Sequence, residues 1–452
     1  MSQVDIAFRG ATVVTPRGRH RRDINVLDGR IVDTGAVVPA AKQTVDADGL
    51  LLMPGMVDTH VHLMDPGPTE REDFPTGTYA AAVRGVTTII EHTHGHPIRE
   101  PEDLHAKRQH LRDRAHVDYA LAAHAWTDRI DRIPALWQAG VAFFKIFTCT
   151  THGVPGFDAG DLLAAFESMS VVGAPTLVHC EDESITARAE ALLRSLGRED
   201  PSVIPDWRNR EAELTAVAVA GVLAQVTGVR ATVAHVSNPA AATLIEEARA
   251  RGADLAAEGC PQYFLLREDD ILDQGALRKF TPPARARSDA DEQRMWDLLR
   301  SGVLTHVSSD HAPATLEQKA EGSIWDVHFG LPGLDTTGSM LFDAAIRGIL
   351  SFEDVVRVYA DTPARRYGLF PRKGHLGAGA DADIILFDPT GTRTLEDSEI
   401  ISKAGWTPYA GRTVRGRVLG TWQRGVRIAG DGRLLEGQHG RFVPGAGSRE
   451  RP

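Results

Sequence analysis

The chain has 452 residues, of which 42% are hydrophobic and 25% are charged, values ordinary for a water-soluble globular protein. Its formal net charge of −11 argues against non-specific nucleic-acid binding, which requires a basic surface. Because a single hydrophobic core rarely serves so long a chain, we expect one large domain and one smaller domain.

The cysteines and the start of the chain indicate the cellular compartment of the protein. Cys149, Cys180 and Cys260 are too few for a disulfide framework, which favours a reducing compartment. Residues 1–10 lack the basic start and apolar centre of a signal peptide, and no apolar stretch is long enough to span a bilayer. We therefore expect a soluble cytoplasmic protein with no membrane or nucleic-acid partner.

Short strands separated by turns are predicted for the first part of the chain. Asp28-Gly29 and Asp48-Gly49 are typical turn sequences between apolar, β-rich segments. The predicted strands are residues 4–8, 11–14, 23–27, 30–33 and 43–46.

From residue 56 onward, apolar β-rich runs alternate with helical segments rich in Ala, Leu and Arg. The runs are residues 56–63, 86–93, 118–126, 142–149, 175–182, 230–237, 253–261 and 304–312. Helices are predicted between them, for example at residues 77–84, 158–172, 211–225, 240–251 and 290–301. Eight β/α units in series predict an α/β protein built as a (β/α)8 TIM barrel.

The chain returns to β-type sequence after further helices at residues 338–349 and 352–360. Strands are predicted at residues 382–387, 414–415 and 418–424, with Asp431-Gly432 as a late turn. We expect residues 1–55 and 366–443 to form one discontinuous β-sandwich domain and residues 56–365 to form the barrel. Residues 444–452 are expected to be a disordered tail.

Polar residues occur late in several apolar barrel runs. His60 and His62 close the apolar run 51–61, and two histidines at i and i+2 of a strand point to the same side. The others are Lys145, His179, His235 and Asp310. Each histidine alone could be a hydrogen-bonded core residue and Asp310 a helix cap, but Lys145 between phenylalanines would bury an ammonium at high cost. Together, at the C-terminal ends of barrel strands, they predict a metal site.

Several motifs resemble those of the amidohydrolase superfamily, in its cyclic-amidohydrolase branch of hydantoinases, allantoinases, dihydropyrimidinases and dihydroorotases. The resemblance covers nearly the whole chain. It rests on residues 54–62 (PGMVDTHVH), 235–239 (HVSNP), 281–283 (TPP), 309–313 (SDHAP) and 373–383.

The resemblance implies a site for two divalent ions, with Zn²⁺ as the default and Mn²⁺, Co²⁺ or Fe²⁺ as alternatives. His60, His62 and Asp310 would bind the first ion and His179 and His235 the second, while Lys145, carboxylated by CO2, would bridge them. A bridging hydroxide would attack a ring carbonyl, and Asp310 would carry its proton to the leaving nitrogen. The family also implies a homo-oligomer, a tetramer, acting on a small cyclic amide.

Two positions distinguish the chain from neighbouring subfamilies. Dihydroorotases carry an Arg where Met64 stands, and Met cannot pair with a substrate carboxylate. Dihydropyrimidinases and many D-hydantoinases carry a Tyr where Thr150 stands. Allantoin or a 5-substituted hydantoin is therefore the favoured substrate; dihydropyrimidines, dihydroorotate and cyclic imides remain alternatives.

Other segments divide between the two favoured subfamilies. The resemblance to allantoinases rests on residues 65–70 with Phe74, residues 76–78, Cys260-Pro261 with Tyr263-Phe264, and residues 407–413. Residues 154–159 and 259–263 instead resemble L-hydantoinases, so the segment around Cys260 matches both subfamilies. Gln262 stands where allantoinases often have a His.

The remaining candidate substrate contacts follow strands two, seven and eight. His92, His94 and His96 replace the Met-Pro type sequence of relatives, and they are read as a surface cluster, a pocket wall or a third metal site. The segments with Thr281, Pro282 and Gly333 would bind substrate through backbone groups. With Met64, His94, His96 and Thr150, they complete the predicted substrate site.

Two other functional classes are weighed against a binuclear hydrolase. Non-catalytic relatives usually lose metal ligands, and all six are present here. A mononuclear deaminase of the same superfamily would lack the bridging lysine, so Lys145 argues against it.

Overall fold

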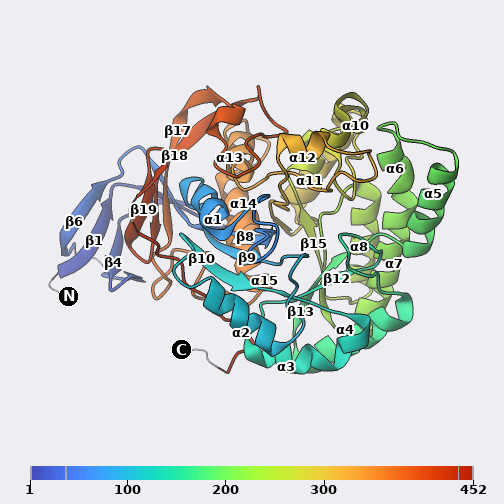
Figure 1. Cartoon of the computed structure of the whole chain (residues 1–452). Helices are drawn as coiled ribbons and strands as arrows, with labels where there is room; N and C mark the ends of the chain where they lie inside the picture. Colours follow the sequence, from blue (N-terminus) through green and yellow to red (C-terminus); the bar gives the residue numbers. More distant parts are fainter. Residues whose placement is uncertain (1–2, 36–37, 436, 450–452) are drawn as a thin grey trace.

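The computed structural model describes residues 3–35, 38–435 and 437–449. Figure 1 shows the two ends of the chain, blue and red, side by side, with the middle of the chain forming a ring of strands and helices beside them. The sheets divide in the same way: two sheets contain strands from the chain ends, and two contain strands from the middle of the chain. The exact division at residues 55/56 and 365/366 remains our proposal.

Strands from both chain ends form the sandwich. One sheet has the order β5-β4-β1-β6, and the other has the order β20-β19-β18-β17-β7-β2-β3. Their bounds are β1 (Gln3–Arg9), β2 (Thr12–Thr15), β3 (Gly18–Arg21), β4 (Ile24–Leu27), β5 (Arg30–Val32), β6 (Ala40–Asp46), β7 (Leu51–Pro54), β17 (Ile384–Thr394), β18 (Thr413–Gln423), β19 (Val426–Gly430) and β20 (Arg433–Leu434). The rings of Phe8 and Trp422 pack edge to face between the two sheets, with their centroids 5.0 Å apart.

The apolar run 51–61 forms two strands in two different sheets, and only the second of these strands was predicted. β7 pairs with β17 in the sandwich, whereas β8 (Met56–Val61) begins the barrel. Gly55 separates them, and a Cβ there would lie 2.1 Å from Thr87 Oγ1, so only glycine fits. The short strand β3 was also not predicted, and the two predicted pieces 414–415 and 418–424 form the single strand β18.

Each of the predicted barrel runs contains a parallel strand. After β8 come β9 (Val86–Glu91), β10 (Asp118–Leu121), β11 (Ala123–His124), β12 (Phe144–Phe147), β13 (Pro175–His179), β14 (Arg230–Val233), β15 (Leu255–Gly259) and β16 (His306–Val307). β10 and β11 share one predicted run, interrupted at Ala122. A bridge between Val61 and His311, and a 2.8 Å hydrogen bond from His62 N–H to His311 O, join the last unit to the first.

Helices surround these strands (Figure 1). They are α1 (Phe74–Val83), α2 (Pro101–His110), α3 (Ile133–Ala139), α4 (Ala159–Val172), α5 (Glu183–Ser195), α6 (Val203–Trp207), α7 (Arg210–Thr227), α8 (Pro239–Ala250), α9 (Gln262–Leu265), α10 (Glu268–Gln274), α11 (Asp289–Ser301), α12 (Leu316–Ala320), α13 (Thr337–Ile346), α14 (Phe352–Val356) and α15 (Thr362–Arg366). Short helical turns cover Thr127–Arg132, Gly275–Arg278, Arg357–Asp361 and Asp397–Glu399. Within the described ranges, no helix has the length and apolarity to cross a membrane.

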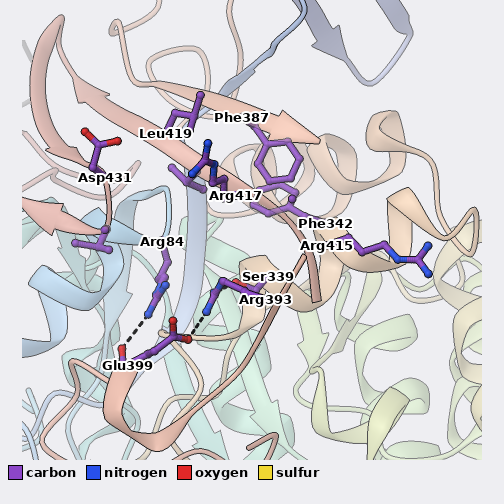
Figure 2. Close-up of a pocket in the computed structure, with 14 residues that line it drawn as sticks. Arg84, Ser339, Phe342, Phe387, Arg393, Glu399, Arg415, Arg417, Leu419 and Asp431 are labelled. Carbon is purple, nitrogen blue, oxygen red and sulfur yellow. Dashed lines mark hydrogen bonds and ion pairs between the residues drawn. The ribbon is translucent and has the colours of Figure 1, made fainter. Parts of the chain in front are cut away.

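A cavity lies where barrel helices meet the sandwich (Figure 2). Arg84, after α1, donates to Glu399 O at 2.9 Å, and Arg393 of β17 pairs with the Glu399 carboxylate. Arg393 also donates to Ser339 Oγ of α13 at 3.1 Å. Glu399 thus joins the two parts of the chain, and none of the predicted metal ligands lines this cavity.

Residues 444–449 were predicted to belong to a disordered tail, but in the structure they pack beside α3. Gly445 N–H donates to Gly140 O at 2.9 Å, and the Gly447 backbone lies against the Trp137 ring, where a Cβ would come within 2.4 Å of Nε1. The small residues let the backbone approach α3, a contact that composition alone does not indicate. Residues 450–452 lie outside the described residues.

Candidate functional site

All six predicted ligands lie at the C-terminal ends of barrel strands. His60 is in β8 with His62 just after it, Lys145 is in β12, and His179 ends β13. His235 and Asp310 follow β14 and β16. The side chains are almost fully buried; Asp310, with 13% of its side chain accessible, is the most exposed.

Donor atoms converge on the His60–His62 side of the site. His60 Nε2 lies 3.2 Å from Asp310 Oδ1 and 3.3 Å from Lys145 Nζ. His62 Nε2 lies 3.7 Å from the same Asp310 oxygen. Nitrogen and oxygen donors at such separations can share one divalent ion.

The other side is formed by His179 and His235. His179 Nδ1 lies 3.0 Å from His235 Nε2, and both residues line the cavity that Lys145 also reaches. Lys145 therefore lines the same cavity as both pairs of histidines. The donor set fits two ions joined by a bridging group on Lys145.

The outer nitrogen of three of these rings is already engaged. His60 Nδ1 lies 2.7 Å from Glu258 Oε1, and His179 Nε2 lies 2.7 Å from Glu181 Oε2. His62 Nδ1 lies 2.6 Å from the carbonyl oxygen of His92. Such outer partners fix the tautomer and direct the remaining nitrogen inward as an acceptor, as in metal sites.

Asp58 holds the backbone beside Asp310. Its carboxylate accepts the Ser309 N–H at 3.1 Å and the Tyr359 hydroxyl at 2.7 Å, and burial raises the pKa of Asp58. Asp310 itself has φ of 49°, an unfavourable backbone conformation for a non-glycine residue. Strain of this kind persists where surrounding contacts fix the backbone, as they do here.

Burial also sets the protonation of the site. It lowers the pKa of Lys145 to about 8, although the nearby Asp310 and Glu258 favour the charged amine. Burial likewise holds the pKa values of His60 and His235 well below the ordinary value, with further lowering by neighbouring cationic groups. These rings are neutral near pH 7, the form that binds metal ions.

The cavity at the site is small. Besides the six predicted ligands, it is lined by His94, Phe147, His152, Phe280, Thr281, Ala312, Phe329 and Gly330. Of the predicted substrate contacts, therefore, His94 and Thr281 reach the cavity. Thr281 Oγ1 donates to Glu181 at 2.6 Å, which holds that side chain beside His179.

The other predicted substrate contacts are absent from this lining. Met64 is buried in the core and Thr150 is exposed, its N–H turned toward Glu183. Pro282 is buried, and its carbonyl accepts the hydroxyl of the buried Tyr263 at 2.8 Å. Gly333 packs behind the site, with its N–H 3.0 Å from His311 Nδ1.

The three histidines after β9 do not share one face. The strand ends at Glu91, so the alternation expected of a strand does not continue through them. His92 is buried at 1% exposure, His94 is half-buried at the cavity, and His96 is exposed and lines a separate cavity beside Pro66. The surface-cluster interpretation therefore fails for His92.

Sequence reasoning missed several residues at the site. Glu258 had a usable signal, because it is a charged residue inside an apolar run, just as Lys145 is. His152 had none. It lies in a loop after β12, yet its ring stacks on His94 with the ring centroids 4.5 Å apart.

Comparisons with known proteins agree with this geometry. The family model for the amidohydrolase family matches residues 51–428. An allantoinase from Rubrobacter xylanophilus is 36% identical over 98% of this chain and 98% of its own length. An L-hydantoinase from Paenarthrobacter aurescens is 32% identical over 97% of this chain and 98% of its own.

A solved structure is also similar to this chain over nearly its whole length. The L-hydantoinase (dihydropyrimidinase) from Arthrobacter aurescens superposes with a TM-score of 0.92 at 31% identity, covering 98% of this chain and all of that one. The matches run the length of the chain and include the strands that carry the histidines, Lys145 and Asp310. The protein belongs to the amidohydrolase family.

Proposed function

We propose that the protein is a binuclear metal-dependent hydrolase that opens the ring of a cyclic amide or ureide, with allantoin or a 5-substituted hydantoin as substrate. The observation that carries the proposal is the convergence of His60, His62, Lys145, His179, His235 and Asp310 on one small cavity. Similarity to an allantoinase and to an L-hydantoinase supports the substrate class.

The residues that would hold the ions divide into two sets. His60, His62 and Asp310 would hold one ion, His179 and His235 the other, and Lys145 both. Zn²⁺ suits these nitrogen and oxygen donors, and Mn²⁺, Co²⁺ or Fe²⁺ can replace it. When bound, such ions supply a water that ionises near neutral pH and polarise a substrate carbonyl.

Lys145 can bridge two ions only after modification, because its ammonium form has no lone pair to donate. A pKa of about 8 leaves a useful fraction of neutral amine near pH 7. This amine attacks the carbon of CO2, loses a proton and becomes an anionic carbamate with two oxygens. The negative charge then removes the cost of a buried ammonium beside His60 and Asp310.

We assign to Asp310 the transfer of the proton during the reaction. Its Oδ1 lies among the histidine nitrogens and its Oδ2 lies 3.5 Å from Gln262 Nε2, so the two oxygens face different groups. The carboxylate would accept a proton from the attacking water and return it to the ring nitrogen as the C–N bond breaks. Phe147, Phe280 and Phe329 would limit access of bulk water.

The test is a ring-opening assay with allantoin, 5-substituted hydantoins, dihydrouracil, dihydroorotate and a cyclic imide, combined with metal analysis. We expect turnover of allantoin or a hydantoin and close to two ions per chain. Lys145→Ala should lose metal and activity together, whereas Lys42→Ala, which changes a lysine with 67% of its side chain exposed, should keep both. A fully active Lys145→Ala variant would refute the carbamate, and no turnover of any panel member would refute the substrate class.

A further inference from the structure

His92 is buried beside the site without a hydrogen bond for its ring. It follows β9 directly and is 1% exposed. Among the residues that the structure describes, neither His92 Nδ1 nor His92 Nε2 has a hydrogen-bond partner. Burying an imidazole in this state is unfavourable, because its polar nitrogens lose water and gain nothing in return.

The ring of His92 lies against the two histidines of β8. Its centroid is 4.4 Å from that of His62 and 4.7 Å from that of His60. The three residues each offer a ring nitrogen within 4.8 Å of the other two. Nitrogens bound at about 2.1 Å to one zinc-like ion stand roughly 3–4 Å apart, so small side-chain adjustments would bring all three onto one ion.

Two other buried clusters of three possible metal ligands occur in the described chain, but each already contacts a positively charged side chain. Cys149, His179 and Glu181 surround Arg208, whose Nη1 lies 3.0 Å from Cys149 Sγ. Asp118, Asp381 and Asp383 surround Lys373.

The His60–His62–His92 group differs from both of them. The ammonium nearest to it is that of Lys145, which the proposed function converts to an anionic carbamate.

We propose that His92 is a further ligand of the ion held by His60 and His62. The inference rests on the proposed function insofar as that function supplies the ion. The main chain of His92 already supports the same site, since its carbonyl oxygen lies 2.6 Å from His62 Nδ1. With its ring as well, His92 makes this side a three-imidazole site, richer in nitrogen than the His179–His235 side.

The experiment compares His92→Phe with His124→Phe in the full-length protein. His124 is a matched control, because it is 2% exposed, has an unpartnered Nδ1 and lies 5.9 Å from the His92 ring. Each metal-free protein is titrated with Co²⁺ against a chelator, and the visible Co²⁺ spectrum is recorded. We expect His92→Phe to bind one of the two ions at least about tenfold more weakly with an altered spectrum, and His124→Phe to match the wild type.

Thermal unfolding separates a ligand from a packing residue. Without metal, His92→Phe should melt no lower than the wild type, because it replaces unpaired buried nitrogens with carbon; with Co²⁺ it should gain less in Tm. If His92→Phe fails to fold, His92→Asn gives the same comparison. Unchanged Co²⁺ affinity and spectrum in either variant would overturn the inference. The Co²⁺ titration needs no substrate, so it tests the role of His92 independently of the ring-opening assay. Unchanged Co²⁺ binding together with ring opening would contradict only the role of His92, and altered Co²⁺ binding without ring opening would contradict only the proposed substrate class.

Discussion

Glu258 Oε1 lies 2.7 Å from Nδ1 of His60 and accepts the backbone N–H of His235 at 3.1 Å. One carboxylate therefore contacts residues that we assign to different ions. Burial raises the pKa of Glu258 to about 8, while the nearby Lys145 favours its ionised form. Its position on β15 makes this strand, which supplies none of the predicted ligands, part of the metal site.

Replacing Glu258 with Gln should weaken metal binding by about 10–100-fold. Bound cations favour the ionised carboxylate of Glu258, and the amide keeps the size of this side chain but cannot supply the negative charge that orients His60. Chelator competition with Zn²⁺ measures the effect. Glu246→Gln, at an exposed position of α8, is the control and should bind as the wild type does. Affinity within twofold of the wild type in Glu258→Gln would show that the ring is held by packing alone.

The sequence predicted the strands and the ligands for the same local reason. A polar residue such as Lys145 or His179 is conspicuous late in an apolar run, and the runs themselves mark the barrel strands. The predicted barrel and sandwich are confirmed. Strand β7 was not predicted as an element of the sandwich, because the residues on both sides of Gly55 are equally apolar.

Contacts between distant loops could not be predicted. His152 stacks on His94, although no periodicity links positions so far apart in the sequence. Thr150 was chosen by its spacing from Lys145, yet the chain turns after β12 and leaves Thr150 exposed. The spacing of residues along a strand predicts the direction of their side chains only as far as the strand continues.

Gly333 tests whether packing behind the site positions Asp310. A Cβ at Gly333 would lie 2.7 Å from Ser309 O, so Gly333→Ala must displace the backbone beside Asp310. We expect kcat to fall by roughly a hundredfold, as misplacement of catalytic groups by about 1 Å can cause. Gly160→Ala in α4, where the nearest atom is the Asp158 carboxylate at 3.3 Å, is the control. Equal kcat values in the two variants would contradict the positioning role.

Lys373 should be essential to stability, because it joins the barrel to the sandwich through buried charges. Its Nζ lies 2.5 Å from Asp118, 3.0 Å from Asp381 and 2.6 Å from Asp383. Burial alone would lower the pKa of Lys373, but these carboxylates raise it above its ordinary value. Lys373→Met should lower the unfolding free energy, measured by urea unfolding, by about 3–5 kcal/mol, since it leaves the buried Asp383 carboxylate without an ion pair. Asp118 keeps Arg424 and Asp381 keeps Arg372 as partners. Adding Asp383→Asn should recover part of the loss, and a loss below about 1 kcal/mol would refute the role of the cluster.

His306 on β16 should make the metal-free protein sensitive to acid. Burial, together with Arg366 and Arg249, lowers the pKa of His306 from 6.5 to about 3. Between these values the unfolded chain binds a proton that the folded protein does not, so the unfolding free energy falls by about 1.4 kcal/mol per pH unit as pH decreases. His306→Phe removes this one contribution and should reduce the slope by that amount in urea unfolding between pH 6 and about pH 4. His20→Gln, at an exposed position of β3, should leave the slope unchanged. Parallel curves for His306→Phe and the wild type would show that His306 is protonated in the folded protein.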